Sequence, residues 1–300
     1  KQKTAYDIMP SLVGSEMCIR DSDPSEVNRH LSSRTKAIIP VDYAGHPADL
    51  EEFLSLAEHR GLVVIEDAAH ALGASYRGRS VGSVSHMTVF SFHPVKHLTT
   101  GEGGMVTTDI DAYARQLRSF RNHGINLDAR ARQRTGQWYY EMTSLGYNYR
   151  LTDMACALGL SQLSLLTRNV QRRREIAQCY KNKLGSVTGL CLPSSRSDSE
   201  SSWHLYPVRI DQKYANGKRD EIFRALRAEG IGVNVHYIPV HLHPYYRTRF
   251  GERAGLCPIA EKVYTELISL PMFHGMLDQD VNDVIEAVDK VLSHFVAGAC

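Results

Sequence analysis

Short apolar runs and longer amphipathic segments alternate along the chain. The runs at 37–43 and 62–67 are rich in β-branched residues and predict two buried strands. The segment between them, 47–60, begins with Pro47 and stops before Gly61, which predicts a helix. Its apolar residues have helical spacing: Leu50, Phe53, Leu54 and Ala57. A strand, a helix and a strand in this order form a βαβ unit, so we expect the two strands to be parallel.

Two more strands and another helix extend this unit. Residues 86–92 and 104–108 are apolar runs that predict strands, and residues 111–120 have the pattern of a helix. The sequence therefore predicts an α/β fold with a mostly parallel sheet. We assign residues 23–165 to this larger domain.

The second half of the chain predicts a smaller α+β domain over residues 166–300. A helix over 151–184, apolar at its start and basic at its end, is expected to join the two domains. Strands are expected at 203–210 and 231–239, with a helix at 219–230. A closing helix is predicted from a stripe of apolar residues: Val281, Val284, Ile285, Val288, Val291 and Leu292.

Residues 1–22 do not follow either pattern. Their string SLVGSEMCIRD resembles a translated sequencing adapter, and they lack the parts of a signal peptide. We therefore expect this segment to be foreign to the fold, and the natural protein to begin near Asp23 without its own first part.

Composition narrows the class of protein. The 300 residues are 43% hydrophobic and 23% charged, which is typical of a globular protein. No apolar run is long enough to span a bilayer, and the net charge of +2 gives no reason to expect a nucleic acid partner. The six cysteines are far apart, so a reducing, cytoplasmic setting is expected.

Two residues at predicted strand ends suggest a chemistry. Asp67 ends the run 62–67, and Lys96 follows the run 86–92. Ligands of open α/β sheets collect beyond the carboxyl ends of strands. Asp67 alone could equally cap a helix, and Lys96 alone could be a solvated surface residue. Together they match the needs of pyridoxal phosphate, which requires a lysine for its aldehyde and a carboxylate for its ring nitrogen.

Glycine spacing argues against nucleotide chemistry. The string TTGEGGMV at 99–106 is neither a dinucleotide fingerprint nor a phosphate-binding loop of the GxxxxGK type. Nucleotide hydrolysis and nicotinamide binding are thus weakly supported.

Several strings in order along the chain resemble the DegT/DnrJ-type sugar aminotransferases. They are VDYAGHPADL, VIEDAAHALGASYRGRSVG, VFSFHPVKHLTTGEGG, LGYNYRLTD and VNVHYIPVHLHPYY. The resemblance runs from about Asp23 to the C-terminus and implies the type I fold of pyridoxal-phosphate enzymes, with a three-layer large domain. It also implies a homodimer with shared active sites. Family members begin with about a hundred further residues that we do not find here.

The resemblance implies a role for each matching residue. Lys96 would form the Schiff base with the cofactor and move the proton, and Asp67 would pair with the pyridine nitrogen. His70 would lie near the phenolic oxygen, and Ser91 would bind the phosphate. Asn148 would reach the phosphate in the partner subunit's site. From the residues alone, Ser91 could instead be an inward strand hydroxyl and Asn148 a turn residue.

His93, His236 and Tyr237 are the candidate residues for binding a nucleotide sugar. A metal site involving His236, His241 and His243 is weakly supported, because no carboxylate or thiol completes a ligand set. The aromatic residues between 138 and 149 are expected in the core and at a dimer contact: Trp138, Tyr139, Tyr140, Tyr147 and Tyr149.

The implied reaction moves an amino group from L-glutamate to C4 of a UDP-4-keto-6-deoxy-N-acetylhexosamine, a step toward pseudaminic acid. A related activity is the C4 amination of a UDP-4-keto-pentose in lipid A modification, whose enzymes share strings like EDAAHA. Lys96 argues against the related 3-dehydratases, which have a histidine at that position. A different class remains open, an inactive truncated fragment that serves only as an interaction module.

Overall fold

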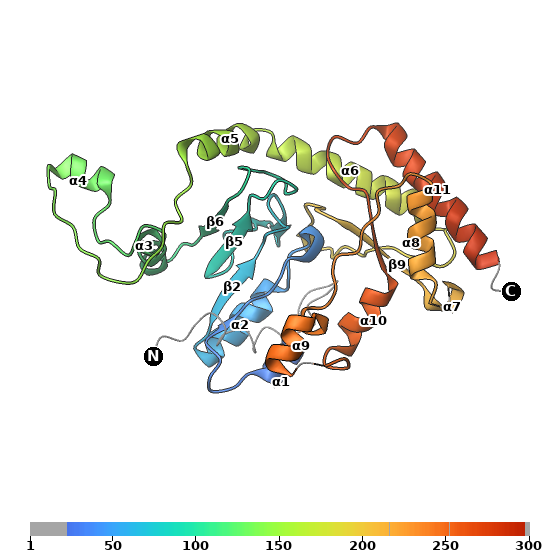
Figure 1. The fold of residues 1–300 in the computed structure, drawn as a ribbon, viewed down its shortest axis with the longest axis horizontal. Coiled ribbons are helices and arrows are strands. Elements are labelled where there is room, and N and C mark those ends of the chain that lie inside the picture. Colours follow the sequence, from blue (N-terminus) through green and yellow to red (C-terminus); the bar gives the residue numbers. More distant parts are fainter. Residues whose placement is uncertain (1–22, 216, 252, 298–300) are drawn as a thin grey trace.

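The computed structural model describes residues 23–215, 217–251 and 253–297 (Figure 1). The segment 1–22, expected to be foreign to the fold, lies outside the described residues. Within the described ranges, no helix has both the length and the apolar character needed to cross a bilayer.

A four-stranded sheet in the order β1-β2-β5-β6 forms the centre of the first half of the molecule (Figure 1). β1, β2 and β5 are parallel, and β6 is antiparallel to β5. Helix α2 connects β1 to β2, as the βαβ pattern predicted. The bounds are β1 Ala37–Ile38, α2 Leu50–Arg60, β2 Val63–Asp67, β5 Met87–Ser91 and β6 Gly104–Thr107. The predicted α/β fold with a mostly parallel sheet is confirmed.

The two faces of this sheet differ. Burial alternates along β2 and β5, and the paired residues Glu66 and Thr88 both lie on the buried face. Helix α2 covers that face through Phe53, which packs in one cluster with Val64. The other face is half-buried and includes Asp67. Because side chains alternate along a strand, one side of the sheet packs and the other remains accessible.

Shorter elements surround the sheet. A small antiparallel sheet, β4-β3-β8, brings residues near 76 and 199 together. The remaining elements of this half are α1 Pro24–His30, η3 Tyr43–Gly45, β3 Ser75–Tyr76, β4 Arg79–Ser80, α3 Asp111–Phe120, α4 Ala129–Thr135 and α5 Asp153–Leu163. Helix α4 lies at the tip of an extended segment that projects away from the sheet (Figure 1).

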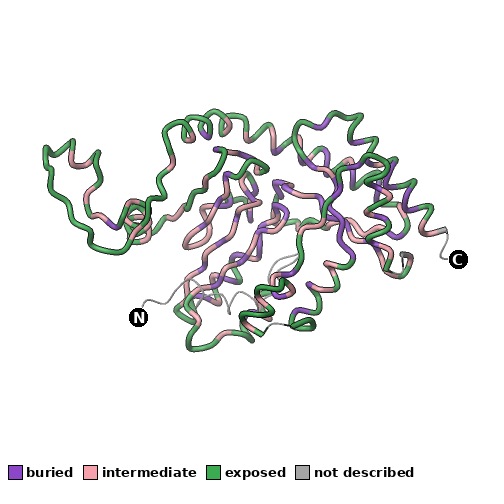
Figure 2. The backbone as a smooth tube through the Cα atoms, viewed as in Figure 1, coloured by how far each residue is buried: buried purple, intermediate pink, exposed green. Residues whose placement is uncertain are grey.

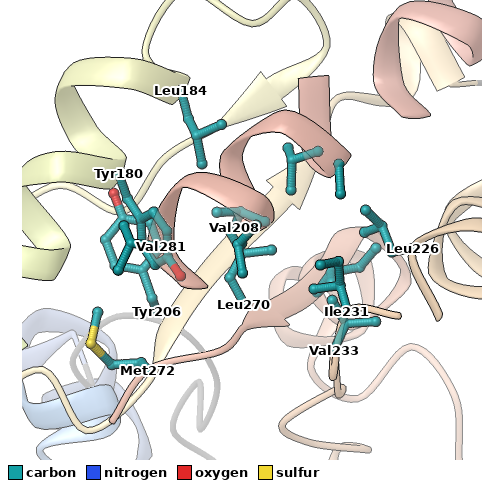
Figure 3. Close-up of a cluster of buried hydrophobic side chains, with 14 of the residues drawn as sticks. Tyr180, Leu184, Tyr206, Val208, Leu226, Ile231, Val233, Leu270, Met272 and Val281 are labelled. Carbon is teal, nitrogen blue, oxygen red and sulfur yellow. The ribbon is translucent and has the colours of Figure 1, made fainter. Parts of the chain in front are cut away.

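The second half has a sheet of its own, antiparallel and in the order β10-β9-β7. Helices α6, α8 and α11 pack on it around one continuous apolar core, which includes Tyr180, Tyr206 and Leu270 (Figure 3). The bounds are α6 Leu166–Leu184, β7 Leu190–Cys191, β8 Ser199–Glu200, β9 Tyr206–Ile210, α7 Gln212–Ala215, α8 Arg219–Ala228, η4 Val240–Leu242, α9 Pro244–Phe250, α10 Pro258–Glu266, β10 Leu267–Leu270 and α11 Asp278–Ala297.

The single helix predicted over 151–184 is instead two helices, α5 and α6. The Ser164 hydroxyl donates to the Ser161 carbonyl at 2.7 Å, and the Leu165 amide bonds back to Gln162 at 3.0 Å. Such local bonds compete with the regular helical ladder and interrupt it. The apolar pattern continues across this break, which is why the sequence suggested one helix.

Two predicted strands differ from the structure. The run 37–43 yields only β1, because the chain turns at η3 and Val41 forms one isolated bridge to Asp67. The segment 231–239 is not a strand: it pairs only through Asn234, whose amide and carbonyl both bond Ser269.

The aromatic residues between 138 and 149 are not in the core. Trp138 is 83% exposed and Tyr149 is 64% exposed. The tube through this segment is exposed along most of its length (Figure 2). Core packing was therefore the wrong prediction for this cluster, and a dimer contact stays a prediction.

Candidate active site

Asp67 and Lys96 come from neighbouring strands of the first sheet. Asp67 is the last residue of β2, and one carboxylate oxygen accepts the Ala69 amide at 3.1 Å. Lys96 follows β5 in a tight turn, where its amide donates to the His93 carbonyl at 3.0 Å. β2 and β5 are parallel neighbours, so both residues lie at the carboxyl edge of the sheet.

The environment of Lys96 disfavours its ammonium form relative to a solvated lysine. Lys96 is half-buried, and this burial lowers the pKa of its amine. The Asp67 carboxylate acts in the opposite direction and raises the same pKa, but burial is the larger effect. A lysine in such a setting is a better nucleophile toward a carbonyl than a solvated one.

His70 is held in one tautomer by the backbone. Its Nδ1 accepts the Ala44 amide at 3.3 Å, which leaves the proton on Nε2. Burial lowers the pKa of His70 to about 3, and the charge of Lys96 adds to this effect. His70 is therefore a neutral hydrogen-bond donor at physiological pH.

Ser91 lies on the same face of the sheet as Asp67. Asp67 pairs with Val89 across the parallel strands, and Ser91 is two residues further along β5. Its hydroxyl accepts the His93 amide at 3.4 Å. The next strand approaches closely here, because a Cβ added at Gly104 would lie 2.8 Å from the Phe90 carbonyl oxygen.

His236 belongs to the same neighbourhood. Its Nδ1 lies 2.9 Å from the Ser269 hydroxyl, and its carbonyl accepts the Tyr43 hydroxyl at 2.5 Å. Burial and the charge of Lys96 both lower the pKa of His236. The ring of Tyr237 packs edge-on against His236 and is half exposed.

Two predicted site residues have a different setting. His93 is exposed, and its Nδ1 accepts the Val95 amide at 3.4 Å. Asn148 is exposed and forms an antiparallel bridge with Asn122, just after α3. Neither is drawn into the histidine group around Lys96. His241, once considered as a metal ligand, bonds Glu261 at 2.8 Å.

The sequence missed His204 and gave His97 no role. His97 is buried directly after Lys96, and His204 is buried between β8 and β9. The rings of His204 and His70 have centroids 4.4 Å apart. The one signal in the sequence is that His204 interrupts the apolar run WHLYPVRI, which makes it a polar residue where a core residue is expected.

A comparison with protein families identifies this arrangement. Residues 7–289 match the model of the DegT/DnrJ/EryC1/StrS aminotransferase family. The chain belongs to this family. The match starts within the segment 1–22, whose foreign origin stays a prediction.

Individual relatives agree with this membership. An uncharacterized protein of Methanocaldococcus jannaschii, MJ1066, is 45% identical over 89% of this chain and 70% of its own length. The spore coat polysaccharide biosynthesis protein SpsC of Bacillus subtilis is 42% identical over 90% of this chain and 70% of its own length.

A solved structure shows the same fold. Helicobacter pylori PseC, an aminotransferase involved in pseudaminic acid biosynthesis, superimposes with a TM-score of 0.83. It is 32% identical, and the match covers 91% of this chain and 71% of PseC. The chain thus has the fold of the pyridoxal-phosphate-dependent aminotransferases, and its family is one of sugar aminotransferases.

The family implies pyridoxal phosphate as cofactor, and the residues at the sheet edge fit it. Lys96 provides an amine whose burial disfavours the ammonium form, which suits a Schiff base with an aldehyde. Asp67 provides a carboxylate at the end of β2, close enough for its charge to act on Lys96. The donor set is therefore the one that this cofactor requires.

Proposed function

We propose that this DegT/DnrJ-family chain moves an amino group from L-glutamate to C4 of a UDP-4-keto-6-deoxy-N-acetylhexosamine. The observation that supports this best is the half-buried amine of Lys96 within the field of Asp67 at the sheet edge. The similarity to PseC supports the choice of sugar.

The proposed roles follow from the contacts of each residue. Bound pyridoxal phosphate supplies the electron sink that weakens the Cα–H bond of the amino donor. Lys96 would hold the cofactor through its aldehyde carbon, and its amine would move the proton between the donor Cα and that cofactor carbon. Asp67 would keep the ring nitrogen protonated, because a carboxylate next to that nitrogen favours its charged form. His70 would donate from Nε2 to the phenolic oxygen, since Nδ1 accepts the Ala44 amide.

The remaining predicted residues would bind the phosphate and the sugar. The Ser91 hydroxyl lies on the Asp67 face and would donate to the cofactor phosphate. His236 and Tyr237 would face the nucleotide sugar, and His93 would approach it from the exposed side of the turn that carries Lys96. The amide nitrogen of Asn234 donates toward Nε2 of His236 at 3.3 Å, so the ring proton is on Nδ1, which faces Ser269, and Nε2 would be the ring's acceptor on the sugar side.

We also propose a homodimer in which residues 23–165 bind the cofactor and residues 166–300 form the smaller domain. Apolar side chains with substantial exposure lie on α5 and on the projecting segment: Met154, Leu160, Trp138 and Met142. Exposed large apolar side chains of this kind are typical of a protein–protein contact. Asn148 lies at the base of the same segment and would reach the partner's phosphate site.

Reductive labelling tests the cofactor site. Purified protein is mixed with pyridoxal phosphate, reduced with borohydride, and digested for mass spectrometry. We expect the label on Lys96, and an absorbance band near ~400–430 nm before reduction. Lys262→Ala, a change at an exposed lysine, should label like the unaltered protein. Label scattered over surface lysines would mean that the chain is an inactive fragment.

Substrate exchange then tests the sugar. A separate, unreduced sample loaded with pyridoxal phosphate is given L-glutamate and either the keto-hexosamine or the UDP-4-keto-pentose, and amino sugar formation is measured. Faster turnover of the keto-pentose would assign the chain to the lipid A type instead. If neither sugar is turned over but Lys96 is labelled, the proposed cofactor lysine would stand and both proposed sugar substrates would be rejected.

A further inference from the structure

Three histidines from three separate segments form a group beside Lys96. The ring of His204 has its centroid 4.4 Å from that of His70 and 5.3 Å from that of His97. His97 and His204 are buried, and His70 is half-buried. His97 follows Lys96 directly, and His204 comes from the second half of the chain. The group therefore joins the lysine turn to the smaller domain.

Ser202 ties two of these histidines together. The Nε2 of His97 lies 3.0 Å from the Ser202 carbonyl, and the Ser202 hydroxyl donates to the His70 carbonyl at 3.0 Å. Because a carbonyl only accepts, the proton of His97 must be on Nε2. Its Nδ1 is buried and has no hydrogen-bond partner among the described residues.

Arg173 is buried and binds the backbone of the segment that carries His204. One terminal nitrogen of Arg173 donates to the carbonyls of Trp203, His204 and Met272, at 3.1, 3.2 and 2.8 Å. Arg173 lies on α6, so this helix holds the segment that carries His204. The segment between β8 and β9 is thereby anchored on both sides, to α6 and to the lysine turn.

The histidines of this group are uncharged. Burial lowers the pKa of His97 to about 3 and lowers that of His204 further. The largest charge effects on both come from basic groups, which disfavour a further positive charge. For His97 these groups are Arg173, Lys96 and His274, and for His204 they are His70, His97, Lys96 and Arg173.

We propose that His97 and His204 are positioning residues for Lys96. As neutral, buried rings they hold the lysine turn against Ser202 and His70, so that the amine stays half-buried near Asp67 with no second charge from the group itself. They need not touch cofactor or substrate to do this. The inference rests on Lys96 being the cofactor lysine of the proposed function.

The test measures the ionisation of Lys96 in protein without added cofactor. Trace acetylation with acetic anhydride from about pH 6 to pH 11, read by mass spectrometry, gives a labelling midpoint for each lysine. Exposed Lys262 is the internal reference. In the unaltered protein we expect the Lys96 midpoint to lie below that of Lys262, because burial disfavours the ammonium form.

Variants of His97 separate positioning from packing. His97→Leu removes the donor to Ser202, whereas His97→Gln keeps a donor nitrogen at a similar reach. We expect His97→Leu to raise the Lys96 midpoint by about half a pH unit or more, since a looser turn exposes the amine. His97→Gln and the exposed control His294→Leu should stay within about 0.2 pH units of the unaltered protein.

Variants of His204 test the ring itself. His204→Phe keeps an uncharged ring against His70, so its shift should be smaller than that of His204→Ala. Equal shifts in the two variants would overturn the role of His204.

Three results would overturn the proposal for His97. The first is a folded His97→Leu protein with an unchanged Lys96 midpoint, and the second is an equal shift in His97→Gln. If His97→Leu does not fold, His97→Asn, which is too short to reach Ser202, is measured in its place. Failure of both to fold is the third, because it would assign His97 to the fold alone. A Lys96 midpoint no lower than that of Lys262 in the unaltered protein would overturn the proposed function as well.

Discussion

Strands β2 and β9 have five residues each but opposite burial. In β2 every second residue is buried and the others are half-buried, whereas in β9 only Arg209 lies outside the core. The half-buried face of β2 includes Asp67, and its strand neighbour β5 leads to Lys96. Apart from Arg209, β9 is buried on both sides. The first sheet therefore leaves one face partly accessible, where reactive side chains can meet a ligand, whereas the second sheet is mostly buried and contributes mainly to the hydrophobic core.

The buried face of the first sheet is also less apolar than the core around β9. Glu66 and Thr88 face each other there at 2.6 Å, and Asp42 bonds the Ala48 amide at 2.9 Å. The cluster around β9 is made of apolar and tyrosine side chains (Figure 3). We therefore expect activity to be sensitive in the first region and stability to be sensitive in the second.

The largest effect should come from Lys96→Ala. Without its amine the chain cannot hold the cofactor covalently, so we expect amino transfer to fall about a thousandfold or more. The melting temperature without cofactor should change little, because Lys96 is only half-buried. Turnover and thermal unfolding are compared with Lys262→Ala. Retention of more than about a tenth of the activity would contradict the assignment of this region to chemistry.

A pair of isoleucines tests the packing side of the comparison. Ile268 in β10 is fully buried, whereas Ile65 in β2 is half-buried. Truncating a buried isoleucine leaves a cavity and costs about 3 kcal/mol, but a half-buried one costs about 1 kcal/mol. We therefore expect the free energy of unfolding of Ile268→Ala to be about 2 kcal/mol lower than that of Ile65→Ala, as measured by urea unfolding. Equal losses would show that the two sheets contribute alike to stability.

Acid should weaken the junction of the two regions. The pKa of His70 and of His97 is about 3 in the folded protein, against a usual value of 6.5. The unfolded chain therefore binds more protons between these values, and stability is lost as pH falls from 6.5 toward 3. Each such histidine adds about 1.4 kcal/mol per pH unit to the slope.

His97→Gln removes one of these protons from the unfolded chain. Its free energy of unfolding should thus fall less steeply than that of the unaltered protein, which urea titrations between pH 7 and pH 4.5 can measure. Identical slopes would mean that His97 does not stay neutral in the folded protein.

The smallest effect concerns Glu66 under the first sheet. Burial raises the pKa of Glu66 above its usual 4.5, so stability is lost as pH rises from 4.5 through the folded value. Glu66→Gln cannot ionise and still accepts the Thr88 hydroxyl. We expect it to gain up to about 1 kcal/mol relative to the unaltered protein between pH 5 and pH 8. Glu58→Gln, at an exposed position of α2, is the control. If the free energy of unfolding of Glu66→Gln relative to the unaltered protein is the same at pH 5 and pH 8, the role of burial is refuted.

Much of the fold could be predicted because apolar runs and helical spacing are local signals. The βαβ unit and α11 were found in this way. The break between α5 and α6 was not, since it depends on the Ser164 hydroxyl bonding its own helix rather than on any change of pattern. The strand expected at 231–239 failed because its pairing partner is limited to Ser269.

From the residues alone, without the family resemblance, the site was predictable only where position along a strand revealed it. Asp67 and Lys96 stand out because each follows an apolar run. His204 has no such signal, because its contacts with His70 and His97 join segments that are far apart in sequence. Its role depends on how the two halves of the chain meet, which local patterns do not encode.

The alternation along β2 places two adjacent acids in opposite surroundings. Glu66 faces the packed side, where its carboxyl is driven toward the protonated form, and Asp67 faces the accessible side. A slip of one residue in the pairing of β2 with β5 would exchange them. Asp67 would then be sealed under the sheet, and Glu66, with its longer side chain, would replace it at the accessible edge near Lys96. The register of β2 against β5 thus determines which carboxyl group is buried and which is accessible, as well as which apolar side chains pack. A shift of this register would therefore impair both folding and the proposed chemistry.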